Sequence, residues 1–251
     1  EGELQVWETA ESKTSFEITF NKINPFGLYH WYGLAFVLCA LSWLFRKPWI
    51  NRCNLHFLTV LAALHTWGLI ARVYISDYPP ITNLYSTAIF IGWMIVVSAL
   101  IIEALFKRGI GNIIAAVCGF LTLNIANALS LDGDTMQMMQ AVLDTKFFLM
   151  THVITINMGY AATYIAAMAG IISLIYALFK SEKENKELFK ILNSTIYGTI
   201  AFAIFFSFIG TILGGLWADD SWGRFWGWDP KENGALLIVI WCAIILHAKI
   251  G

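Results

Sequence analysis

Seven long runs of apolar residues constrain this chain more than any other feature of its sequence. They cover approximately residues 28–45, 55–75, 84–106, 111–131, 148–179, 195–217 and 234–250. An α-helix needs about 20 apolar residues to cross the hydrocarbon core of a bilayer. Continuous runs of this length are far too long for the strands of a membrane barrel. The sequence therefore predicts an all-α fold, a polytopic integral membrane bundle of about seven transmembrane helices.

The composition agrees with this fold class and excludes some functions. Of the 251 residues, 58% are hydrophobic and 13% are charged, whereas an average soluble domain has roughly 25% charged residues. A net charge of -1 gives no basic field, so no nucleic-acid partner is expected. The cysteines are widely spaced and form no CxxC or CxxCH pattern. The chain is therefore not expected to carry a covalent c-type haem of its own.

Basic residues divide the connecting segments into two groups that alternate along the chain. Segments 46–52, 107–108 and 180–190 are rich in Lys and Arg. The alternate segments hold few: 76–83 has none, 132–147 has Lys146, and the segment before the last run has Arg224 and Lys231. Lys and Arg are retained on the cytoplasmic side of a membrane. We therefore expect the N-terminus and this last segment to face outward, with membrane lipid around the bundle.

The first 25 residues differ from the rest of the chain. The stretches LQVWET and TSFEITFNK alternate apolar and polar residues and end at Asn24-Pro25. This alternation predicts an external, strand-like tail over 1–25, followed by a transmembrane domain over 26–251. The tail is interpreted as the end of a larger external domain.

Tryptophan is concentrated at 217–233, which is named the Trp-rich loop here. Its rings are interleaved with glycines, which permit close approach of a flat partner. Arg224 or Lys231 could neutralise a carboxylate of such a ligand, and Asp229 before Pro230 favours a turn and a helix cap. A planar, acidic ligand such as haem suits this pattern, although an interfacial aromatic belt also explains it. The candidate binding residues are Trp222, Gly223, Arg224, Trp226, Gly227, Trp228 and Asp229.

Two histidines are candidate ligands of iron. His152 lies near the start of the fifth run, at the same predicted face as the Trp-rich loop. His247 lies at the far end of the seventh run, so a metal role for it implies a second site near the inner face. For His30 and His56 an ordinary interfacial role is favoured. For His65 a structural role and a functional role both stay open.

The motif WGRFWGWDPKE, followed by an apolar helix ending in ILHAKIG, resembles the WWD signature of haem-handling proteins. Within that group the chain resembles the CcsA family, or the A-portion of fused CcsBA proteins, of the System II cytochrome c synthase. The stretch LHTWGLIARVYISDYPPITNLYS and the histidine that opens the fifth run also fit. The resemblance covers approximately residues 26–251, and the tail would match the junction with a B-portion.

The resemblance implies a function, partners and roles for the two histidines. It implies transport of non-covalent haem b across the bacterial inner membrane and its attachment to the CxxCH cysteines of apocytochrome c. Such a protein is a thioether-forming lyase, a holocytochrome c synthase. His152 would be an external axial ligand beside the WWD motif, and His247 a ligand of an inner site. The other ligand of each site would lie outside this chain, one of them in CcsB or a fused B-portion.

Two other functions stay open on the sequence. A haem exporter or delivery protein of the CcmC type shares the WWD motif but forms no thioether bond. A quinone-binding or anchor subunit of a membrane complex also uses rings and a histidine, without this tryptophan spacing. No catalytic residue is assigned, since Asp219, Asp220 and Asp229 are equally suited to structural roles.

Overall fold

The computed structural model describes residues 2–45, 47–131, 133, 135–136, 141–179 and 185–250. Within these ranges the chain is helical and contains no strand. The elements are α1 (Gly2–Ile23), η1 (Pro25–Leu28), α2 (Tyr29–Phe45), α3 (Pro48–Ser76), α4 (Leu84–Phe106), α5 (Ile110–Ser130), η2 (Ala141–Leu143), α6 (Lys146–Phe179), α7 (Lys186–Trp222) and α8 (Pro230–Ile250).

The predicted helical membrane bundle is confirmed. Among the described residues, seven helical segments are long and apolar enough to cross a membrane, and the first of them runs from Glu11 to Phe45. The other six correspond to α3–α8. The helices α6 and α7 have 34 and 37 residues, so each is considerably longer than the roughly 30 Å hydrocarbon core requires.

The strand-like tail predicted for residues 1–25 is wrong, because Gly2–Ile23 forms the helix α1. Phe16 and Phe20, four residues apart, lie on one face of α1 and both pack against Trp67 of α3. Residues four apart share a face of a helix, and they also share a face of a strand, because four is a multiple of the strand period of two. In so short a stretch the apolar pattern therefore fits a helix as well as a strand. The predicted end of this segment at Asn24-Pro25 is present: Asn24 has φ 46° and precedes η1.

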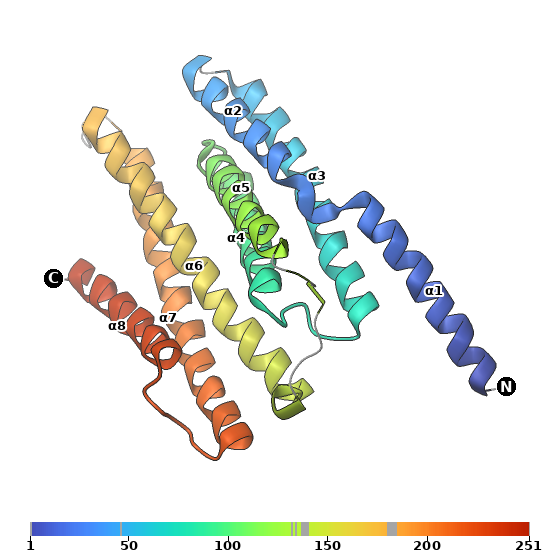
Figure 1. Cartoon of the computed structure of the whole chain (residues 1–251). Helices are drawn as coiled ribbons and strands as arrows, with labels where there is room; N and C mark the ends of the chain where they lie inside the picture. The colour runs from blue at the N-terminus through green and yellow to red at the C-terminus, as the bar shows by residue number, and fades with distance from the viewer. Residues whose placement is uncertain are drawn as a thin grey trace.

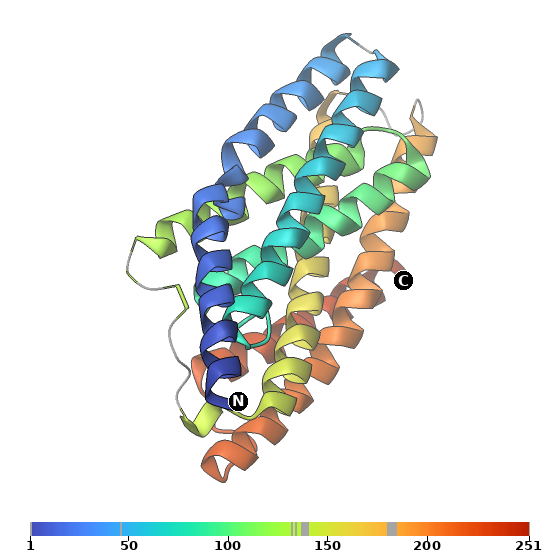
Figure 2. The same ribbon diagram turned by 90° about the vertical axis from the view of Figure 1, so that its right-hand side faces the viewer.

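The helices form two groups that meet along α6. Figure 1 shows α2, α3, α4 and α5 on one side and α6, α7 and α8 on the other, and both Figures 1 and 2 show α1 continuing beside α3. Contacts between α4 and α6 join the two groups. The C-terminal helix α8 packs chiefly on α7 and leaves Leu237, Ile240, Trp241 and Ile244 exposed.

The most extensive helix–helix contact in the fold is between α6 and α7. Glycines permit this approach. A Cβ added to Gly210 would lie 2.8 Å from the Cα of Ile156, and one on Gly159 would lie 2.3 Å from Ser207 Oγ. The two backbones are therefore nearly in contact, and this fixes the register in which α6 presents its side chains to α7.

The two ends of the bundle differ in chemistry. The α2–α3 and α4–α5 turns, the end of α6 and the start of α7 lie at the upper end in Figure 1. The Trp-rich loop lies at the opposite end, where α7 passes into α8 (Figure 1). The basic segments and the tryptophan motif are thus separated by the length of the bundle, as the alternation of basic residues predicts.

Candidate functional site

The Trp-rich loop consists of the last turns of α7, an irregular connection over 223–229 and the first turn of α8. Gly223 ends α7 in the left-handed conformation, with φ 67°, and donates its N–H to Asp219 O over 2.8 Å. This is a usual way to terminate a helix, and glycine adopts it without steric cost. The chain then reverses toward α8.

The start of α8 is a capping box. Asp229 Oδ1 accepts hydrogen bonds from the backbone N–H groups of Lys231 (2.8 Å) and Glu232 (2.9 Å). Glu232 Oε2 reaches back to accept from the N–H groups of Gly227 (2.7 Å) and Asp229 (3.2 Å). These reciprocal bonds satisfy donors that a helix N-terminus otherwise leaves free. The predicted helix cap at Asp229 is confirmed.

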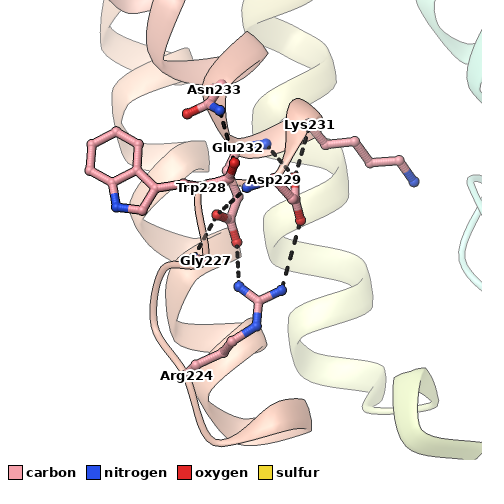
Figure 3. A network of polar contacts seen from close by, with 7 residues as sticks. All are labelled: Arg224, Gly227, Trp228, Asp229, Lys231, Glu232 and Asn233. Atoms are coloured by element: carbon pink, nitrogen blue, oxygen red, sulfur yellow. Dashed lines mark hydrogen bonds and ion pairs between the residues drawn. The ribbon is translucent and has the colours of Figure 1, made fainter.

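Arg224 neutralises the carboxylates of the loop itself. Its Nη1 lies 3.2 Å from Glu232 Oε1 and its Nη2 lies 3.9 Å from Asp229 Oδ2. Gly227 makes room for this guanidinium, because a Cβ there would lie 1.5 Å from Nη1. Figure 3 shows the guanidinium below both carboxylates, with the Lys231 ammonium pointing away from them. Arg224 and Lys231 are the two cations proposed to meet an acidic ligand. Arg224 is paired within the loop, so Lys231 is the one whose charge is more available to a ligand.

Several rings of the loop are open to the surroundings. Trp222, Phe225 and Trp228 are 56%, 44% and 69% exposed. Trp226 is partly buried and meets Trp228 edge to face, with ring centroids 5.9 Å apart. Trp228 has φ 58°, and its carbonyl accepts a hydrogen bond from Asn233 Nδ2 over 2.9 Å. The side chain thus extends outward from the capping network (Figure 3). Several exposed rings within one short loop are a candidate interaction surface.

His152 is held in a defined position and tautomer. Its Nδ1 lies 2.8 Å from the carbonyl oxygen of Gly210 on α7. A carbonyl oxygen only accepts, so Nδ1 carries the proton and Nε2 keeps its lone pair. Gly214, one turn further along α7, lies directly under the ring, since a Cβ there would approach His152 Cε1 to 2.6 Å. An imidazole oriented by a backbone carbonyl is the usual state of a metal-binding histidine.

Adjacent glycines of α7 connect His152 to the Trp-rich loop. Gly214 accommodates the His152 ring, and Gly215 accommodates Phe225, whose Cε2 would lie 2.6 Å from an added Cβ. Trp217 lies beside His152 with ring centroids 5.6 Å apart. The structure therefore brings His152 and the loop together, as the sequence predicts. The indole Nε1 atoms of Trp217 and Trp226 are buried and have no acceptor among the described residues.

His247 belongs to a different place in the molecule. It is exposed on α8, and its Nδ1 lies 2.8 Å from Ala243 O, so its Nε2 also keeps the lone pair. Two residues further on, Lys249 Nζ lies 4.4 Å from the Tyr197 ring on α7. Tyr197 and Gly210 are thirteen residues apart, or about 20 Å along a helix. One iron cannot bind both His152 and His247.

The other histidines lie away from both places. His65 is fully buried in α3 and meets Phe26 edge to face at 5.7 Å. His30 is exposed and packs on Tyr29 with ring centroids 3.8 Å apart, and His56 is exposed on α3. Within the described ranges, no group of three or more His, Cys, Asp or Glu residues could hold a bare metal ion. Any iron held by His152 or His247 would therefore need further ligands.

Comparison with known proteins identifies the family. The profile of the family described as "Cytochrome C assembly protein" matches residues 81–250. The chain belongs to this family. It shares 28% identity with protein NrfI of Wolinella succinogenes, over 96% of this chain and 27% of that protein. It shares 29% identity with cytochrome c biogenesis protein CcsA of Guillardia theta, over 76% of this chain and 71% of CcsA.

A third relative is the cytochrome c biogenesis protein CcsA of Chlamydomonas reinhardtii, with 31% identity over 72% of this chain and 53% of that protein. The chain spans only about a quarter of the length of NrfI. The predicted resemblance to the CcsA type is confirmed, and membership of the family implies a role in cytochrome c maturation. The match includes α4–α8, and so both His152 and the Trp-rich loop.

Proposed function

We propose that this chain carries haem to the outer face of a bacterial inner membrane and presents it there for attachment to apocytochrome c. The observation that carries the proposal is the position of His152. Its Nε2 keeps a lone pair, it is oriented by Gly210 O, and it lies beside a loop of exposed rings. A planar iron porphyrin is a ligand that uses both a basic nitrogen, at its iron, and an aromatic surface, at its ring.

The polar groups around the site fit the edges of haem. The buried Nε1 donors of Trp217 and Trp226 have no acceptor among the described residues, so a bound carboxylate or carbonyl would satisfy them. The ammonium of Lys231 is available, because within the described part of the chain its backbone N–H bonds to Asp229 and its side chain is in no ion pair. Haem carries carboxylates on one edge and vinyl groups on another. Anchoring the carboxylates leaves the vinyl edge free to meet another protein.

The proposed reaction needs positioning more than acid–base catalysis. A cysteine thiol of the CxxCH motif adds across a haem vinyl group: the S–H bond and the π bond of the vinyl group break, an S–C bond and a C–H bond form, and no atom is lost. The thiolate is supplied by the substrate, so the role of this chain is to hold the two reactants in register. Bis-histidine ligation would also leave no open coordination position on the iron.

His247 supports a second, inner site in the same proposal. It is exposed next to the face of α8 on which Trp241 and Ile244 are also exposed. A further helix, from a CcsB-type partner or a fused B-portion, could pack on this face and supply a second ligand. The iron would then pass from the end of the bundle near Lys249 to the end near the Trp-rich loop.

The test is the absorption spectrum of the detergent-purified protein in its longest natural form, before and after dithionite. Reduced bands of six-coordinate b-type haem are expected, weakened or shifted in His152→Ala. His56→Ala removes an exposed histidine elsewhere and should leave the spectrum unchanged. If protein from haem-sufficient cells shows no Soret band, the haem proposal is wrong.

Co-expression with an apocytochrome c distinguishes attachment from delivery. Covalent haem on the cytochrome that is lost with His152→Ala supports a synthase. Haem bound to this chain without any covalent product would indicate a delivery function of the CcmC type. Covalent product thus reports on the attachment reaction, and haem bound without covalent product reports on haem binding alone.

A further inference from the structure

An open-sided cavity of about 930 Å³ lies at the end of the bundle opposite the Trp-rich loop. It is formed between the α2–α3 and α4–α5 turns on one side and α6 and α7 on the other. This volume is within the range of roughly 300–1,000 Å³ seen for small-molecule sites. Neither His152 nor His247 lines it, so it is separate from the proposed haem sites.

The charge of the cavity lining is strongly positive. Lys47 and Arg52 come from the α2–α3 side, and Lys107 and Arg108 from the α4–α5 turn. Arg108 pairs with Glu187 at the start of α7. For the other three cations, no ion pair is present within the described ranges. The site therefore offers positive charge that the described residues do not neutralise.

The single acidic residue of the described lining is a structural element. Glu103 is 1% exposed, and its oxygens accept from Asn51 Nδ2 (2.7 Å), Gly109 N (2.8 Å) and Gly111 N (3.1 Å). Asn112 Nδ2 in turn donates to Asn51 Oδ1 over 2.8 Å. The carboxylate thus joins α3, α4 and the start of α5, and holds the basic turns in place. Its negative charge is already satisfied by these donors.

Ser42, Asn51 and Asn185 add polar groups to the wall, and the remaining lining residues are apolar or aromatic. Trp43 and Tyr176, which both line the cavity, meet edge to face with ring centroids 6.3 Å apart. Gly109, with φ 80°, lies under the indole, where an added Cβ would approach Trp43 Nε1 to 2.7 Å. The other apolar lining residues are Pro48, Leu55, Ile110, Ile172 and Leu188. Cations are therefore combined with an apolar wall, which suits a ligand that has an acidic head and a hydrocarbon body.

We propose that this cavity binds the headgroup of an anionic phospholipid of the inner leaflet. Under the orientation proposed above, it lies at the depth of those headgroups, and basic pockets between transmembrane helices on that side are known to hold them. Iron porphyrin is disfavoured because the described lining contains no histidine. Phosphate oxygens would contact Arg52 and Lys107, and an acyl chain would lie against Trp43 and Leu55.

Native mass spectrometry tests the proposal on the full-length protein in nanodiscs of tetraoleoyl cardiolipin, phosphatidylglycerol or phosphatidylcholine. Anionic lipid should be retained on the protein, and phosphatidylcholine should not. The double variant Arg52→Gln/Lys107→Gln should weaken anionic lipid binding by at least about tenfold, and Arg52→Lys/Lys107→Arg should largely restore it.

The control removes two charges at the same end but outside the cavity. Lys190 and Lys249 line a separate, shallower cleft between α7 and α8. Lys190→Gln/Lys249→Gln should change lipid retention by less than about twofold, so an equal loss in both double variants would refute a specific site. Displacement by millimolar inorganic phosphate would assign the cavity to a free anion. Because no haem is measured, failure here leaves the haem proposal untouched.

Discussion

Gly214 of α7 lies directly beneath the His152 imidazole, so close that a Cβ on the glycine would be 2.6 Å from the ring. The next residue, Gly215, receives Phe225 of the Trp-rich loop in the same way. Two adjacent glycines on one helix therefore determine how near the candidate ligand comes to the aromatic loop. The consequence is that the site depends on the helix pair α6–α7 and not on the loop alone.

Gly214→Ala should disturb haem binding without removing any candidate ligand. The added methyl group forces the His152 ring away from Gly210 O, and the tautomer is no longer fixed. We expect a loss of b-type haem per protein approaching that of His152→Ala, measured from the Soret absorbance of the purified variants.

Gly198→Ala is the matched control for Gly214→Ala. It lies on the same helix, and an added Cβ would meet nothing within 4 Å. It should leave haem content unchanged and stabilise the helix by roughly 0.5–1 kcal/mol. Equal haem content in the two variants would show that the ring does not need the space at Gly214.

Glu232→Ala should loosen the Trp-rich loop. The change leaves the N–H groups of Gly227 and Asp229 without their acceptor and removes the closest partner of Arg224. We expect the free energy of unfolding to fall by roughly 1–2 kcal/mol. This fall is seen as a lower Tm when unfolding in detergent is followed by tryptophan fluorescence. Glu11→Ala is the control, at an exposed position of α1. Its free energy of unfolding should stay within about 0.5 kcal/mol of that of the parent protein. A Tm equal to that of the parent protein would mean that Glu232 contributes nothing to the loop.

The positions of the membrane helices were predictable because run length alone decides them. The predicted run 84–106 coincides with α4, whose start is fixed by the Asn83 cap and whose end is fixed by Lys107 in the left-handed conformation. The N-terminal tail was predicted wrongly because a short alternating stretch also fits a helical period. There, packing of Phe16 and Phe20 on α3 decides the structure.

The site was predictable where the signal is local and not where it depends on packing. Asp229 before Pro230 indicated the cap, and the spacing of Asp229 and Glu232 is itself a capping-box pattern that sequence reasoning missed. The space that Gly227 gives to Arg224, and the role of Gly214 under His152, depend on tertiary contacts. No local sequence pattern specifies which glycine of one helix faces a histidine of another.

His152→Ala and His247→Ala should act independently on haem added to the purified protein. Tyr197, near the His247 end of α8, and Gly210, beside His152, are about 20 Å apart along α7. Among the described residues the two histidines share no hydrogen-bond partner, so their effects should add. Each single variant should lose a different part of the bound haem, and the double variant should lose both parts. The pyridine haemochrome assay measures this. A double variant no worse than either single one would indicate one site in place of two.

Glu103→Ala should destabilise the fold more than any change in the Trp-rich loop. It leaves the N–H groups of Gly109 and Gly111 and the Asn51 amide without their buried acceptor, at a cost of about 3 kcal/mol. Glu103→Gln keeps one acceptor oxygen and should lower the free energy of unfolding less.

Leu105→Ala is the control, at a position 71% exposed on the same helix. It should change Tm little, because no buried contact is lost. These effects are read from thermal unfolding in detergent. A Glu103→Ala protein as stable as Leu105→Ala would show that α3, α4 and α5 are held together by their apolar contacts alone, without this carboxylate.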